Sequence, residues 1–194
     1  MSKIEINSLW SLEHYSKIRK EFRKEIMEHK KNRRIVLGEN LSLIFEDEKT
    51  IRYQVQEMLR IEKTFESSGI RDELDAYNPL IPDGRNFKCT MMIEYPDPEV
   101  RKKKLMLLKG VEKKVWIKVE GRDRIWSIAD EDLDRENDEK TSAVHFLRFE
   151  LDEDMVKALK YGVCLSIGVD HPEYKFSIDP LSNKTRTSLV KDLN

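Results

Sequence analysis

Apolar residues recur at steps of three and four along several stretches of the chain, which is the spacing of one helix face. The first stretch predicts an amphipathic helix over residues 11–30, whose apolar positions are Leu12, Tyr15, Ile18, Phe22 and Ile26. A second predicts a helix over residues 49–65, and Ser67-Ser68-Gly69 is expected to end it. Shorter helices are expected over residues 71–77, 98–109, 152–160 and 185–193.

Elsewhere apolar and polar residues alternate, which predicts strands with one buried face. Arg34–Leu37 and Leu41–Glu46 flank the turn Gly38-Glu39-Asn40 and predict a β-hairpin. Phe87–Tyr95 should form a strand with Cys89, Met91, Ile93 and Tyr95 on one face. Further strands are expected over residues 115–119, 124–128, 143–151, 163–169 and 174–178.

Helices and strands do not alternate strictly, which argues against a doubly wound parallel sheet. No Pro-rich or Gly/Ser-rich linker divides the chain, and no internal repeat is found. We therefore expect an α+β fold in which residues 1–194 form a single domain. Its sheet should be mixed but mostly antiparallel, with helices packed on it.

The net charge of the chain bears on which classes of binding partner are expected. The 36 Lys and Arg residues nearly cancel the 37 Asp and Glu residues, for a net charge of −1, which gives no support for nucleic-acid binding. No apolar run is long enough to span a bilayer, and the N-terminus has no secretory signal pattern, so we expect a cytoplasmic protein with no membrane contact. Cys89 and Cys164 form no CxxC pair and are expected to be buried, reduced thiols.

The sequence contains none of the common motifs of catalysis or cofactor binding. GxxxxGK[ST], GxGxxG, GxSxG and HExxH are all missing. No Glu lies three positions before a His, so the helical di-iron pair is also missing. We expect no cofactor.

The richest polar stretch lies between Thr50 and Gly84. Arg52, Gln56 and Arg60 are i, i+4 neighbours on one edge of the predicted helix, with Tyr53 and Glu57 in an adjacent row. Such a strip could hold a carboxylate or phosphate between two guanidinium groups, with Glu57 as an acid or base and Tyr53 as a proton donor. Alternatively, it is a salt-bridge network that positions the helix. The set of candidate ligand- or partner-binding residues is completed by Asn78, Asp83, Lys88 and Glu94.

A metal site is a weaker expectation, with Glu57, Glu94, His145 and His171 as its candidates. His145 alternates with apolar residues and could equally be a hydrogen-bonded core histidine, and His171 could be an exposed turn residue. His14 and His29 are expected at the surface of the first helix. The charge-dense residues 129–140 predict a solvated loop or surface helix, with an acidic metal site as the alternative.

Several long strings in the chain suggest a family. They are IRYQVQEMLRIE, ELDAYNPLIPDG, TMMIEYPD, IADEDLDRENDEKTSAVHFLRFEL and GVDHPEY. Together they resemble the bacterial family catalogued as domain of unknown function 3501, over nearly the whole chain. The resemblance implies no particular activity and no catalytic residues. What it implies is a functional context: proteins of this family look like companions of rubrerythrins and of iron–sulfur proteins similar to heterodisulfide-reductase subunits.

Two function hypotheses follow from these observations. The first is a non-enzymatic accessory or binding protein that docks on a redox partner (a rubrerythrin or an iron–sulfur protein, in oxidative-stress defence) or holds a small anionic ligand. The second is a small-molecule enzyme that uses acid–base or carboxylate/His metal chemistry around Glu57. Whether the protein is an enzyme is left open by the sequence.

Overall fold

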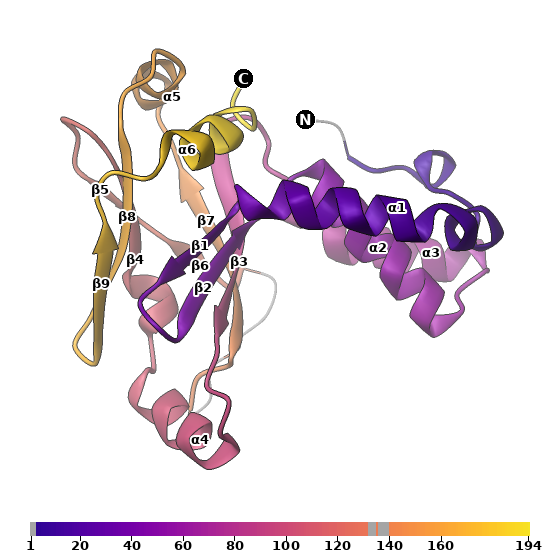
Figure 1. Cartoon of the computed structure of the whole chain (residues 1–194), viewed down its shortest axis with the longest axis horizontal. Coiled ribbons are helices and arrows are strands. Elements are labelled where there is room, and N and C mark those ends of the chain that lie inside the picture. Colours follow the sequence, from indigo (N-terminus) through magenta and orange to yellow (C-terminus); the bar gives the residue numbers. More distant parts are fainter. Residues whose placement is uncertain (1–2, 132–134, 136–139) are drawn as a thin grey trace.

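The computed structural model describes residues 3–131, 135 and 140–194, and these combine two antiparallel sheets with helices (Figure 1). The expected α+β class is confirmed. The strands, however, divide between two sheets where one was expected, because alternation identifies a buried face without identifying the sheet to which a strand belongs.

The larger sheet has the strand order β1 (Arg34–Leu37), β2 (Leu41–Phe45), β3 (Asn86–Ile93), β7 (Val144–Glu150) and β6 (Ile128–Ala129). All of its pairings are antiparallel. The predicted hairpin forms at Gly38, whose positive φ of 74° suits glycine at this turn. Cys89, Met91 and Ile93 are buried on one face of β3, as predicted.

The smaller sheet has the order β5 (Arg124–Trp126), β4 (Val115–Val119), β8 (Leu165–His171) and β9 (Tyr174–Ile178), and it is also antiparallel. The inner faces of both sheets contribute to one hydrophobic core, in which Phe45, Phe87 and Phe149 contact one another. The two sheets therefore form a sandwich.

The first three α-helices form a separate layer beside the sandwich (Figure 1). These are α1 (Leu12–Lys31), α2 (Glu48–Glu62) and α3 (Ser67–Tyr77), with short 3-10 turns η1 (Ile6–Ser8) and η2 (Asn78–Leu80). They have a hydrophobic cluster of their own, made of Ile4, Ile51, Val55, Leu59, Leu74 and Ile81. None of the described helices is long and apolar enough to cross a membrane.

The other helices border the sandwich. In the sequence, α4 (Pro98–Leu107) and η3 (Val111–Lys114) connect β3 of the larger sheet to β4 of the smaller one. α5 (Glu153–Lys160) and α6 (Asn183–Val190) lie near one end of the sandwich (Figure 1). Asp97, Asp152 and Ser182 each accept a backbone N–H bond as the N-cap of α4, α5 and α6. These caps fix where each helix begins.

Two local predictions need correction. Ser67-Ser68-Gly69 does not end α2: the helix ends at Lys63, which takes the left-handed conformation (φ 54°), and Ser67 begins α3. Cys89 is buried as expected, but Cys164 is half-buried; both are free thiols. Most of the charge-dense 129–140 segment (132–134 and 136–139) lies outside the described residues.

Candidate functional site

The outer face of the larger sheet carries a concavity that combines apolar walls with charged groups. Lys88 on β3 and Arg148 on β7 are register partners, so their side chains lie side by side on this face. Phe146 is two positions from Arg148, and Pro79 and Leu80 of η2 approach from the helical layer. We call this concavity the Lys88 pocket; its volume is about 440 Å³, and it is lined by Pro79, Leu80, Lys88, Glu131, Phe146, Leu147 and Arg148.

Lys88 is half-buried in this pocket. Its ammonium group donates to the carbonyl oxygens of Pro79 (2.6 Å) and Ile81 (3.0 Å). Burial lowers the pKa of Lys88, although nearby carboxylates, with Asp83 foremost, oppose the shift. Two carbonyl groups take two of the three ammonium protons, so the third is available to another acceptor.

Arg148 is the second cation of the pocket. Its Nε and Nη2 donate to the two carboxylate oxygens of Glu131 at 2.7 Å each, and its Nη1 donates to Glu150. The bond to Arg148 lowers the pKa of Glu131. The guanidinium therefore already holds one carboxylate in the fork geometry that Arg uses for carboxylates in general.

The predicted strip on α2 lies elsewhere and is occupied by contacts within the protein. Glu57 accepts a fork of two bonds from Arg19 (2.8 Å each), one bond from Tyr15 (2.7 Å) and one from Arg60 (3.3 Å). The bond from Arg19 is the main reason why the pKa of Glu57 falls to about 2, against the opposing effect of burial. The carboxylate is thus ionised and fully bonded, which is unsuited to proton transfer near neutral pH.

The other residues of the strip hold the N-terminal segment against the helical layer. Gln56 is fully buried and exchanges hydrogen bonds with the backbone of Trp10. Arg52 donates to the carbonyl of Ser8 and to Glu48. Tyr53 is buried against the ring of Phe22. These contacts match the alternative of a network that positions the helix.

The remaining predicted residues are dispersed. Asn78 exchanges two hydrogen bonds with the backbone of Ile4. Asp83 bonds Asn86 and the backbone of Arg85 in a turn. Glu94 accepts from Ser42 and Arg34 at the other end of β3. Arg52, Asp83 and Lys88 each line a different concavity, so the nine candidates do not form one site.

The four weak metal candidates are also apart. In the described part of the chain, no group of three or more His, Cys, Asp and Glu side chains could hold a metal ion. His145 is fully buried, between Asp130 (2.5 Å) and Thr141 (2.9 Å). His171 is buried too, where an exposed turn residue was one expectation, because β8 extends to include it and its Nε2 contacts the carbonyl of Lys109 (3.0 Å).

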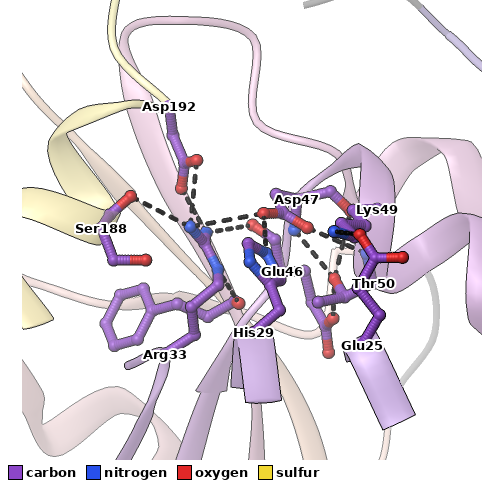
Figure 2. Close-up of polar contacts among 10 residues, drawn as sticks. Glu25, His29, Arg33, Glu46, Asp47, Lys49, Thr50, Ser188 and Asp192 are labelled. Atoms are coloured by element: carbon purple, nitrogen blue, oxygen red, sulfur yellow. Dashed lines mark hydrogen bonds and ion pairs between the residues drawn. The ribbon is translucent and has the colours of Figure 1, made fainter. Parts of the chain in front are cut away.

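A second polar centre joins the helical layer to the sandwich and to α6 (Figure 2). Arg33 is 1% exposed, and its five N–H groups bond the carbonyls of Phe45, Glu46 and Ser188 and both carboxylate oxygens of Asp192. With every donor used, this guanidinium is a structural cation. We call these residues, with Asp47 and His29, the Arg33 centre.

His29 is part of this centre, where the sequence indicated a plain surface position. Its Nε2 lies 2.6 Å from the carboxylate of Asp47, which also caps α2 and lies 3.4 Å from Arg33. Burial would raise the pKa of Asp47, but Arg33, the Thr50 N–H and His29 together lower it. For Asp192 burial dominates, and its pKa rises to about 6 despite Arg33.

Sequence reasoning missed both the centre and the pairing of Lys88 with Arg148. Arg33 lies in a basic cluster with Lys30 and Arg34, and the residue types there do not distinguish it from its neighbours. One signal could have identified it. Arg33 immediately precedes the strand Arg34–Leu37, in which every second residue is buried, and the same alternation places Arg33 on the buried face. Nothing in the sequence connects it to Asp192, because the contact spans 159 positions.

Comparison with known proteins now gives the chain its place. Residues 3–193 match the family model described as "Protein of unknown function (DUF3501)". The chain belongs to this family. A crystal structure of a novel protein of unknown function from Burkholderia pseudomallei is 47% identical to this DUF3501 chain, with a TM-score of 0.95 and 100% of each chain covered. The comparison with curated proteins found no match to this chain. The family membership confirms the resemblance and assigns no site.

Proposed function

We propose that this protein is a binding protein that holds a small anion with an apolar body in the Lys88 pocket. The observation that supports it most is the half-buried ammonium of Lys88, placed beside Arg148 in a concavity walled by Pro79, Leu80 and Phe146. Small-molecule sites are typically concave and mostly apolar, with a few convergent polar groups that fix the ligand's orientation. A pKa perturbed by burial is a further mark of such sites.

The ammonium group of Lys88 favours an anionic ligand. Glu131 and Glu150 both bond to its neighbour Arg148, whereas no carboxylate among the described residues makes a hydrogen bond or ion pair with Lys88, on which Asp83 acts at longer range. The third proton of the Lys88 ammonium thus remains for a ligand, while Phe146 and Leu80 offer apolar contact. An anion that also carried an apolar group would satisfy both parts of the pocket.

The acid–base alternative around Glu57 draws no support from the geometry. Glu57 is bonded by Tyr15, Arg19 and Arg60, and its pKa is lowered to about 2. An enzyme that relied on Glu57 would have to break these bonds before it could move a proton.

The expected partnership with a rubrerythrin or an iron–sulfur protein, in an oxidative-stress setting, stays a prediction that rests on the resemblance. Its test is co-purification of a tagged chain from the native host, with partners identified by mass spectrometry. Recovery of neither protein class at levels above an untagged control would argue against it.

The ligand proposal is tested with phenylacetate as the probe, by isothermal titration calorimetry and by ligand-observed NMR. Phenylacetate should bind the wild type more tightly than the neutral phenylacetamide. Lys88→Met should lose this preference, whereas the matched control Lys118→Met, on an exposed position of the smaller sheet, should keep it. Phe146→Ala should weaken both probes, and near-UV circular dichroism verifies that each variant is folded. Equal binding by Lys88→Met and the wild type would contradict the proposal.

A further inference from the structure

Arg148 in the Lys88 pocket already holds a carboxylate, that of Glu131. Nε bonds Oε2 and Nη2 bonds Oε1, both at 2.7 Å. This parallel pair of bonds is the arrangement in which a guanidinium recognises a free carboxylate ligand. Glu131 therefore occupies the position that the carboxylate of a ligand would take.

The two carboxylates on Arg148 differ in how firmly they are held. Glu150 lies on β7 and also accepts a bond from Asn86 at 2.8 Å, so it has a second anchor. The side chain of Glu131 is 52% exposed, and Arg148 is its one hydrogen-bonding partner among the described residues. Since Glu131 has no second anchor among the described residues, a ligand carboxylate that formed the same fork would replace its two bonds on Arg148, and the displaced side chain would be hydrated.

Exchange of Glu131 would leave two cations facing the pocket. Lys88 interacts electrostatically with Glu131, since each shifts the pKa of the other. A carboxylate of a ligand would restore the fork on Arg148 and accept the third proton of Lys88. A neutral amide would restore neither charge interaction.

We infer that the ligand of the Lys88 pocket is a carboxylate, and that Glu131 is an internal competitor that occupies its place on Arg148 until the ligand displaces it. This inference rests on the proposed function, because it describes the same pocket. The apparent affinity of the wild type is then reduced by the fraction of molecules in which Glu131 is bound to Arg148. Glu131 would therefore raise the ligand concentration at which half of the molecules are occupied.

The test compares the wild type with Glu131→Gln, which keeps the shape of the side chain and removes its charge. Phenylacetate should bind Glu131→Gln more tightly, by about tenfold if Glu131 occupies Arg148 in some nine-tenths of the molecules. Phenylacetamide should bind both proteins alike. The control Glu13→Gln removes an exposed ion pair with Lys17 (2.8 Å) far from the pocket and should leave both affinities unchanged.

The outcomes separate the two proposals. If wild type and Glu131→Gln bind phenylacetate equally, or if the variant binds it more weakly, the role of Glu131 as a competitor is overturned, while the proposed function of the Lys88 pocket is still supported. If neither protein binds phenylacetate or the aliphatic carboxylate hexanoate, the proposed function fails and the inference fails with it. Arg148→Met separates the cations: binding that survives in this variant with unchanged preference for the carboxylate would overturn the role of Arg148.

Discussion

The hydroxyl group of Tyr174 donates a hydrogen bond of 2.6 Å to the carbonyl oxygen of Leu37. The same hydroxyl accepts a bond from the backbone N–H of Asn40 (3.1 Å). Tyr174 begins β9 of the smaller sheet, while Leu37 ends β1 of the larger one. One phenol group thus joins an edge strand of each sheet at the hairpin turn.

We expect Tyr174→Phe to lower the free energy of unfolding by about 1–2 kcal/mol, because it leaves a partly buried carbonyl and an N–H group without their partner. Urea denaturation followed by circular dichroism measures the change. The control is Tyr161→Phe, at a position that is 90% exposed, which should be neutral. A Tyr174 variant as stable as the wild type would mean that water replaces the hydroxyl without cost.

Glu57 should stabilise the helical layer in a pH-dependent way. Glu57→Gln should cost about 2 kcal/mol at pH 7, since a carboxylate that accepts charge-assisted bonds is replaced by a neutral amide. The folded pKa of about 2 lies below the ordinary value of 4.5, so this stabilisation is complete above about pH 4.5 and is lost as the pH falls towards 2. Urea denaturation of both proteins between pH 7 and pH 2.5 should show their stabilities converging. A constant difference would contradict the lowered pKa.

Asp192 should have the opposite dependence. Its folded pKa of about 6 exceeds the ordinary value of 3.8, so between these values the folded chain holds a proton that the unfolded chain has released. The free energy of unfolding of the wild type, relative to Asp192→Asn, should therefore fall as the pH rises from 4 to 6. The upper limit is about 3 kcal/mol, at about 1.4 kcal/mol for each pH unit between the two pKa values. Above pH 7 the difference should be constant; a rise between pH 4 and 6 would mean that Arg33 outweighs burial.

The sequence predicts a single domain, and the Arg33 centre gives that prediction a physical basis, because it joins α1, the start of α2 and α6. Trp10 lies in the helical layer and Trp116 in the smaller sheet. In each of the variants Trp116→Phe/Trp126→Phe and Trp10→Phe, the urea midpoint from fluorescence should therefore coincide with the midpoint of the same variant from far-UV circular dichroism. Separate midpoints would mean that the helical layer and the sandwich unfold as two units.

The sequence was informative where a side chain's position follows from its near neighbours. The apolar spacing over residues 49–65 predicted α2, and the alternation of Cys89, Met91 and Ile93 predicted both β3 and its buried face. Periodicity records burial within one element, so the division of the strands between two sheets could not be read from it. The left-handed conformation of Lys63 was also missed, because glycine is the usual residue there and the serines that follow resemble a stop signal.

The candidate site shows a sharper limit. Lys88 was one of the candidate binding residues and lies on a predicted strand, but its pairing with Arg148 depends on the register between β3 and β7. Conversely, the residue types on α2 were those of a binding strip, but whether such side chains are free to bind a ligand depends on which other elements pack against them. Arg19 and Tyr15 of α1 occupy Glu57, a contact that no spacing within α2 could reveal.

The Arg33 centre also bears on how the protein is made. Arg33 precedes Asp192 by 159 positions, so a ribosome exposes the guanidinium, its strands and Asp47 long before the second carboxylate, that of Asp192. During that interval the N–H groups that bond Ser188 and Asp192 in the folded chain have to be hydrated, which keeps the junction between α1 and β1 from closing completely. Synthesis of α6 and Asp192 supplies these acceptors and allows the junction to lose its water. The junction is therefore expected to close only after Asp192 has been made, and until then it is a surface that a chaperone could bind.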